Sequence, residues 1–137
     1  MNWILGIWLF WVILNVILFI VSPFIVKSAG PVTNGLFIKV PDDLKAKVTA
    51  EEFDALMAHE HGHMYHAHNL TNLLGVCFFF FRTKKRMVKQ ELQADDFAAK
   101  HGYAKELASA LYKTSFNDFD FARAARLHKI AYLESGI

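Results

Sequence analysis

The stretch TAEEFDALMAHEHGHMYHAH, residues 49–68, decides the fold because it joins a helix-start signal to a cluster of histidines. Thr49 is followed three residues later by Glu52, the spacing at which each side chain accepts a hydrogen bond from the other residue's backbone N–H. This pattern predicts a helix that begins just after Thr49 and runs through the histidines.

Residues 59–63 of this helix, HEHGH, satisfy the pattern H-E-x-x-H. His59 and His63 are one turn apart on one helical face, about 5–6 Å from each other, so both imidazoles can bind one zinc ion. Glu60 lies beside the first histidine, where it can hold a water molecule at the metal and remove its proton. A solvated helix with scattered histidines remains the alternative, because a five-residue motif also arises by chance.

A catalytic zinc site takes three protein ligands and an open position, so a further ligand is required. His66 shares the helical face, but on a straight helix it lies a turn too far along to reach the same ion. A glycine and then a histidine at positions 66 and 69 could turn the chain back, and these positions hold His66 and Asn69. We therefore expect His66 to be structural, and His61, His68 and His101 to be solvated or to support a ligand.

The better third ligand is in KQELQADDFAAKHG, residues 89–102. Glu91 and Asp95 are four residues apart on one predicted helical face, with Glu91 placed to bind the metal. Asp95 would accept a hydrogen bond from a ligand histidine and fix its tautomer. Asp96 points to another face and is expected to be solvated. The alternative is a surface helix in which these acids pair with the basic run RTKKR, residues 82–86.

Residues 3–26, WILGIWLFWVILNVILFIVSPFIV, contain no charged side chain. A helix of about 20 apolar residues crosses a bilayer core, so residues 1–26 are predicted to form a transmembrane anchor. A cleavable signal peptide fits less well, because the run is too long and has neither a basic start nor a cleavage site. Lys27, Lys39 and Lys45 follow the anchor and favour a cytoplasmic location for the rest of the chain.

The remaining sequence divides into a predicted linker and one domain. Residues 27–35 are rich in small and turn-forming residues, and residues 36–137 form the expected domain. LFIKV, residues 36–40, is expected to be a short edge strand. Residues 70–81 are apolar but too short to cross a membrane, and they are either an interfacial segment backed by RTKKR or an ordinary core helix. Helical patterns cover residues 87–101, 104–113 and 119–133.

Composition excludes some functions. Fifteen basic and thirteen acidic side chains nearly balance, so nothing indicates a nucleic-acid partner. Cys77 is the only cysteine, which excludes an internal disulfide and is compatible with a reducing compartment.

These motifs together resemble the membrane-bound zinc metallopeptidases of the HtpX and CAAX prenyl endopeptidase family. In that family an H-E-x-x-H helix is followed by a basic segment, an E-x-x-A-D helix and an L-A-x-A-L helix, as in residues 49–68 and 82–115 here. The resemblance covers most of residues 36–133. It implies that His59, His63 and Glu91 bind zinc, with Glu60 as general base and Asp95 beside a ligand histidine. Strand 36–40 would then pair with the extended substrate backbone.

The sequence departs from the family at two places. The family's His-Pro positions hold Asn117 and Asp118, and its oxyanion-stabilising arginine corresponds to Arg123, with Arg126 as the alternative. Surface pairing with acids would also explain both arginines. Family members have several membrane helices, whereas only residues 70–81 occupy the gap between the zinc motifs here.

The sequence therefore predicts an α+β, mainly helical fold of zincin (gluzincin) type, with a short edge strand and one preceding transmembrane helix. The predicted function is a membrane-anchored zinc endopeptidase, binding one Zn²⁺ per chain, that hydrolyses peptide bonds by metal-activated water. Expected partners are the lipid bilayer and a protein or peptide substrate in or near it, with no nucleic acid; the oligomeric state stays open. The alternative is an inactive, membrane-tethered zinc-binding or interaction subunit.

Overall fold

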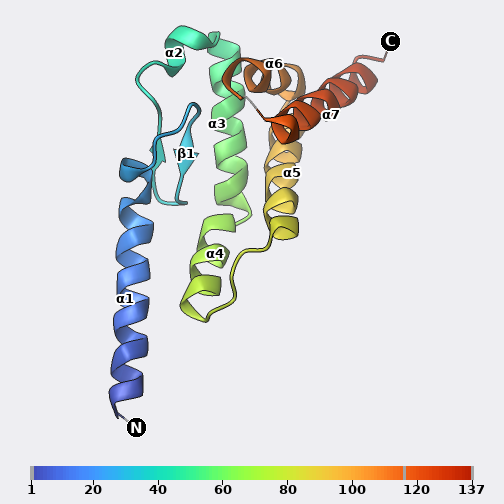
Figure 1. Cartoon of the computed structure of the whole chain (residues 1–137). Helices are drawn as coiled ribbons and strands as arrows, with labels where there is room; N and C mark the ends of the chain where they lie inside the picture. The colour runs from blue at the N-terminus through green and yellow to red at the C-terminus, as the bar shows by residue number, and fades with distance from the viewer. Residues whose placement is uncertain (1, 116, 137) are drawn as a thin grey trace.

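The computed structural model describes residues 2–115 and 117–136 and is mainly helical (Figure 1). The elements in chain order are α1 (Asn2–Ile25), β1 (Val32–Thr33), β2 (Ile38–Lys39), α2 (Leu44–Lys47), α3 (Ala50–Tyr65), α4 (His68–Cys77), α5 (Lys84–Lys100), α6 (Ala104–Thr114) and α7 (Asp118–Glu134). The long helix α1 lies along one side, and the C-terminal end of α7 points away from it.

Helix α3 begins where the sequence predicts. Thr49 accepts a hydrogen bond from the Glu52 backbone N–H, and the Glu52 carboxylate accepts one from the Thr49 backbone N–H, so the predicted capping box is confirmed. The Glu52 carboxylate also accepts hydrogen bonds from Ser109 and Lys113 of α6, at 2.5 and 2.7 Å. The start of α3 is thereby joined to α6.

The core lies where α3, α5, α6 and α7 pack together. Its buried residues are small or leucine, and α6 contributes the largest share: Leu44, Ala55, Leu56, Ala98, Ala99, Ala104, Leu107, Ala108, Ala110, Leu111, Ala124 and Leu127. Gly62 allows α3 and α5 to approach closely, because a Cβ there would lie 2.9 Å from Ala94 Cα. This contact sets the distance between the two helices that carry the expected ligands.

The segment predicted as a linker contains a strand. β1 pairs antiparallel with β2, Val32 opposite Lys39 and Thr33 opposite Ile38. Only Ile38 and Lys39 of the expected strand 36–40 are paired, so that strand is shorter than predicted. Asn34 is buried in the connecting turn, where its Oδ1 accepts hydrogen bonds from the backbone N–H groups of Leu36 and Phe37. A turn-rich composition conceals this strand because a two-residue pairing leaves almost no alternation in the sequence.

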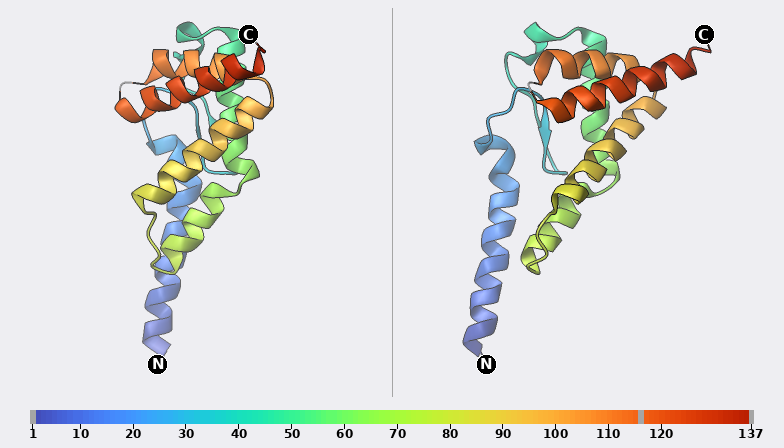
Figure 2. Two further views of the ribbon diagram at one scale, coloured as in Figure 1. Left: turned by 90° about the vertical axis from the view of Figure 1, so that its right-hand side faces the viewer. Right: turned by 45° about the vertical axis from the view of Figure 1, so that its right-hand side comes forward.

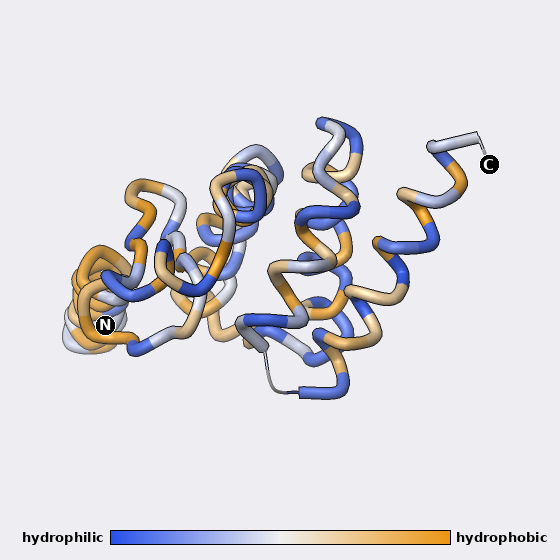
Figure 3. The backbone as a smooth tube through the Cα atoms, turned by 90° about the horizontal axis from the view of Figure 1, so that it is seen from above, coloured by the Kyte–Doolittle hydropathy of each residue, from blue (hydrophilic) through white to orange (hydrophobic). Residues whose placement is uncertain are grey.

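Asn34 also joins the hairpin to α1. Pro23 has no N–H, so it cannot bond to the carbonyl of Phe19 one turn earlier. The Asn34 side-chain amide donates to that carbonyl instead, at 2.9 Å. Helix α1 is long and apolar enough to cross a membrane by length and composition, and the body of the molecule contacts it mainly at this end and through α4. Seen from above, α1 is viewed nearly end-on and is mainly hydrophobic in colour, whereas α7 alternates along its length (Figure 3).

Candidate metal centre

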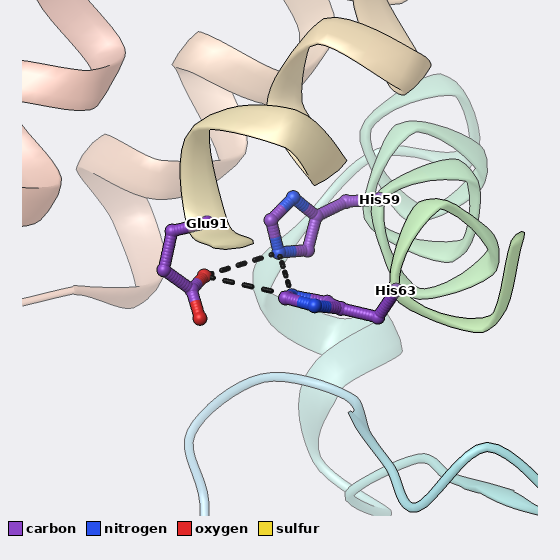
Figure 4. A group of neighbouring side chains, drawn as sticks. All are labelled: His59, His63 and Glu91. Atoms are coloured by element: carbon purple, nitrogen blue, oxygen red, sulfur yellow. Dashed lines mark hydrogen bonds and ion pairs between the residues drawn. The ribbon is translucent and has the colours of Figure 1, made fainter. Parts of the chain in front are cut away.

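Helices α3 and α5 bring three expected ligands to one point. His59 and His63 lie one turn apart on α3, and Glu91 faces them from α5 (Figure 4). Each imidazole directs Nε2 toward the glutamate. The three ligand atoms come from residues that are buried or half-buried, in the interior between the helices.

The spacing of these atoms fits a zinc ion. His59 Nε2 and His63 Nε2 are 3.1 Å apart, and Glu91 Oε2 is 3.4 Å from the first and 3.6 Å from the second. Ligands at about 2.0–2.1 Å from a tetrahedral zinc ion are separated by about 3.3 Å. Two imidazoles and one carboxylate are also the donor set of a catalytic zinc site with an open position.

Asp95 holds His59 from behind. Its Oδ1 lies 3.0 Å from His59 Nδ1, so it can accept a hydrogen bond from that nitrogen and leave Nε2 facing Glu91. Burial alone would lower the pKa of His59, but the contacts with Asp95 and Glu91 raise it to about 9. Burial raises the pKa of Glu91, yet its contacts with the two histidines leave that pKa well below its usual range. The pocket therefore favours positive charge between these side chains.

His63 is held in the same way by a residue of the next helix. His63 Nδ1 is 2.9 Å from His68 Nδ1, and His68 Nε2 is 3.1 Å from the side-chain oxygen of Gln93. If both imidazoles donate toward Gln93, Nε2 of His63 is free to bind metal. Burial and the neighbouring His63 lower the pKa of His68 to about 4, which keeps it neutral.

The sequence could not single out His68 among the histidines. Helix α3 ends at Tyr65, and Ala67 adopts a left-handed conformation with φ of 51°, which returns the chain so that His68 lies against His63. His61, His66 and His101 are exposed.

Glu60 is buried beside the ligands and lines a pocket together with Thr33 of β1. Burial is the main reason why the pKa of its carboxyl rises to about 7, and the nearby Glu91 carboxylate raises it further. A backbone hydrogen bond from Thr33 opposes that change. A carboxyl group with a pKa near neutrality can accept a proton and return it at physiological pH.

Arg123 of α7 reaches this centre, and Arg126 does not. Arg123 forms a two-pronged pair with Asp95, Nε to Oδ2 at 2.9 Å and Nη2 to Oδ1 at 2.7 Å, and Nη1 donates to Asp120 at 2.8 Å. Its Nη1 is also 3.4 Å from Glu91. Arg126 pairs instead with Asp96 away from the ligands. The pair of Asp120 and Arg123 has the i,i+3 spacing within α7 that a sequence can reveal, whereas the contact of Arg123 with Asp95 exists only because α7 packs against α5.

Two pockets flank the ligands. One, of about 480 Å³, is lined by Ser28, Gly30 and Pro31 on one side and by His59, Glu91 and Arg123 on the other. A second, of about 270 Å³, is lined by Thr33, Glu60 and His63 among others. β1, in the segment predicted as a linker, therefore borders the site, while β2 lies on the side of α1. This differs from the expectation that strand 36–40 lines the substrate cleft.

Comparison with known proteins adds one finding. A family model described as peptidase family M48 matches residues 28–88. This segment, less than half of the chain, is similar to peptidase family M48. The M48 segment includes the hairpin, His59, Glu60 and His63, and it ends shortly before Glu91.

The similarity of this segment to peptidase family M48 indicates a metal-dependent peptidase and agrees with the resemblance seen in the motifs. No curated protein and no solved structure matches the chain. The geometry beyond the M48 segment, which contributes Glu91, Asp95 and Arg123, therefore stands on the structure itself.

Proposed function

We propose that the chain is a membrane-anchored, zinc-dependent endopeptidase with a zincin-type domain of gluzincin form. The observation that carries this proposal is the triangle of His59, His63 and Glu91, at the separations that one tetrahedral ion requires, with a buried glutamate beside it. The M48 match over the histidine motif supports the reaction class.

The donor set fits zinc, and a zinc ion held there would supply a Lewis acid that polarises a carbonyl and acidifies water. Glu60 is the general base: its carboxylate takes a proton from the attacking water and passes it to the leaving amine. Asp95 and His68 orient the imidazoles of His59 and His63 through their Nδ1 atoms. No covalent acyl-enzyme is needed in this reaction.

Arg123 is proposed to stabilise the developing oxyanion. A guanidinium has five N–H groups, and the three hydrogen bonds to Asp95 and Asp120 leave two of them. Nη1 lies 3.4 Å from Glu91 Oε2, and Nη2 lies 3.4 Å from His59 Nε2. The two remaining N–H groups are therefore on the side of the metal ligands. The carboxylates of Asp95 and Asp120 hold the guanidinium in place.

The substrate is proposed to be a peptide segment in or close to a membrane. Residues 28–31, which line the larger pocket, follow α1 after only a short stretch of chain. A substrate backbone entering there would run alongside β1, whose second edge faces α3 rather than another strand. If α1 crosses the bilayer, the cleft lies next to the membrane surface.

Metal analysis and cleavage of an unfolded protein such as casein test this proposal together. The purified protein should contain about one zinc per chain, and Glu91→Ala should lose it. Glu60→Gln should retain the zinc and the fold but lose cleavage, because an amide cannot accept the proton. Undiminished cleavage by Glu60→Gln would disprove its role.

Full zinc occupancy without cleavage by the unchanged protein would favour the alternative, an inactive zinc-binding subunit. Retention of zinc by Glu91→Ala, with loss in His66→Ala, would disprove the ligand set itself.

We place the metal centre on the cytoplasmic side, because Lys27, Lys39 and Lys45 lie just after α1. A single exposed cysteine at Ser135, in a chain with Cys77→Ala, reports the side of the membrane. A membrane-impermeant thiol reagent should fail to label it in intact cells and label it after lysis. Labelling in intact cells would reverse the topology.

A further inference from the structure

The end of α4 and the loop after it expose a run of large apolar side chains. Phe78, Phe79, Phe80 and Phe81, here called the phenylalanine tip, are 54–74% exposed, and Leu70 and Leu74 on α4 are also exposed. Four consecutive exposed phenylalanines are a large apolar surface for a water-facing loop. The tip therefore requires something that covers it.

Two contacts fix the tip against α1. The ring of Trp8 lies 5.9 Å from that of Phe78, and Trp11 stacks on Phe79 at 5.8 Å. The indole N–H of Trp8 donates to the carbonyl of Cys77 at 3.3 Å, and that of Trp11 donates to the carbonyl of Val76 at 3.2 Å. The tip is therefore an extension of the surface of a candidate membrane span.

The backbone at this helix end is satisfied without water. The last carbonyls of a helix have no partner in the helix itself, and at an exposed end water normally serves. Here Leu74, Gly75 and Val76 accept from the backbone N–H groups of Phe78, Phe80 and Phe79 in turn. The tryptophans of α1 serve Val76 and Cys77. Hydrocarbon requires such internal satisfaction, because no water is available there.

Gly75 makes this closure possible. Phe79 has φ of 63°, and the chain folds back so far that a Cβ at Gly75 would lie 2.6 Å from the Phe80 carbonyl oxygen. A strained turn that exposes four phenylalanines, at a helix end whose last carbonyls are all bonded within the protein, is explained by an apolar surrounding and not by water.

The position of the tip along α1 gives its depth. Trp11 and Trp8 lie about 21 and 25 Å from the Ile25 end of α1 at about 1.5 Å per residue. The hydrocarbon core of a bilayer is about 30 Å thick. In Figures 1 and 2 the tip lies level with the N-terminal half of α1, and the start of α5 lies nearer the Ile25 end.

Three basic residues at the start of α5 follow: Lys84, Lys85 and Arg86, here called the basic cluster. Arg82, just before them, faces Glu91 instead, at 3.8 Å. The basic cluster lies on the side of the tip toward the body of the molecule. Basic side chains at that level suit the phosphate groups of an anionic leaflet, and their aliphatic stems can extend past apolar surface.

We propose that the phenylalanine tip and the end of α4 insert into the hydrocarbon core of the bilayer, packed against α1, with the basic cluster on anionic headgroups. The molecule then holds the membrane at two places, α1 and the tip. This double attachment fixes the height and tilt of the metal centre above the bilayer. The proposal rests on the part of the proposed function in which α1 crosses the membrane, and it does not depend on peptidase activity.

Nitroxide labels on single cysteines test the insertion in the full chain, reconstituted in vesicles of phosphatidylcholine and phosphatidylglycerol. Cys77→Ala provides the background and introduces no new polar group. Labels replace Phe80 in the tip, Ile13 on the exposed side of α1, and Tyr132, an exposed aromatic residue on α7 far from α1. Each label is measured for collision with molecular oxygen, which dissolves in lipid, and with a water-soluble nickel chelate.

Oxygen should exceed nickel at positions 13 and 80, and nickel should exceed oxygen at position 132. Nickel in excess at position 80, with position 13 still in lipid, would overturn the insertion and leave the anchor in place. Nickel in excess at both positions would overturn the membrane span of the proposed function as well. Protection of position 80 from both reagents, with magnetic broadening between labelled copies, would mean that a second copy covers the tip and would overturn the proposal.

A charge-matched pair of variants tests the basic cluster. Lys84→Gln with Lys85→Gln should reduce the excess of oxygen over nickel at position 80. Lys105→Gln with Lys129→Gln removes the same charge from exposed positions on α6 and α7 and should leave it unchanged. Equal values for both pairs would overturn the headgroup contact.

Discussion

Asp95→Asn perturbs the most deeply buried charge of the site. The Asp95 side chain is 0% exposed and contacts both Arg123, at 2.7 and 2.9 Å, and His59, at 3.0 Å. All three partner atoms are nitrogens that donate. An asparagine retains the shape, but its amide nitrogen must face a donor, and the negative charge that neutralises Arg123 is lost.

The magnitude follows from this geometry. Removing one partner of a buried ion pair costs about 3–5 kcal/mol of unfolding free energy. Asparagine retains one hydrogen bond, and Arg123 still pairs with Asp120 at 2.8 Å, so we expect the lower end, about 3 kcal/mol. For a chain of this size that corresponds to a fall in Tm of about 10 °C. Release of His59 should also weaken zinc binding by about 10–100-fold.

Thermal unfolding in detergent, followed by circular dichroism with a metal chelator present, measures the stability without a contribution from zinc. Zinc affinity is then measured by competition with a chromophoric chelator. Asp96→Asn is the matched control: the neighbouring residue has a 44% exposed side chain and pairs with Arg126, so it should cost less than about 1 kcal/mol and leave zinc affinity unchanged. Equal falls in Tm for the two variants would refute the account of a buried network that supports His59.

Three further outcomes are expected. Gly62→Ala should destabilise the protein by about 1–3 kcal/mol and weaken zinc binding, because the added Cβ would lie 2.9 Å from Ala94 Cα. Gly30→Ala, which has open space around it, should be neutral in the same unfolding assay. Burial raises the pKa of Glu52, but the hydrogen bonds from Lys113 and Ser109 leave that pKa below its usual value. The contribution of Glu52 to stability should therefore be fully present above about pH 4.5 and decline as the pH falls through the lowered pKa. Glu52→Gln should reduce this decline in scans of Tm against pH. Zinc at about 100 times its Kd should stabilise the chain by about 2.7 kcal/mol over the chelated form, and an unchanged Tm would contradict binding to the folded state.

Local patterns predicted the helices and which candidate ligands share a helical face. The capping box at Thr49 and Glu52 places the start of α3, and the spacing within a helix places His59 with His63 and Glu91 with Asp95. Such features depend on the 3.6-residue period and on bonds within one turn, so a linear sequence contains them. The sequence predicted only from the combined motifs that Glu91 meets the two histidines. In the structure Glu91 Oε2 lies 3.4 and 3.6 Å from their Nε2 atoms.

Other features depend on where elements cross. β1 lies in a segment whose composition resembles a linker, and it becomes a strand because Asn34 closes the turn and bonds the Phe19 carbonyl that Pro23 leaves free. His68 could not be distinguished from the other histidines until the left-handed Ala67 returned the chain to His63.

The sequence by itself determined the apolar helix α1, the helix that carries the histidines, and the residue types able to hold zinc, because each is a property of neighbouring residues. Only the tertiary structure decided that β1 borders the pocket, that Arg123 is held by Asp95, and that Trp8 and Trp11 satisfy the carbonyls at the end of α4. These contacts join residues far apart in the chain, and their free energy depends on burial and on the partners that packing supplies, which no local pattern encodes.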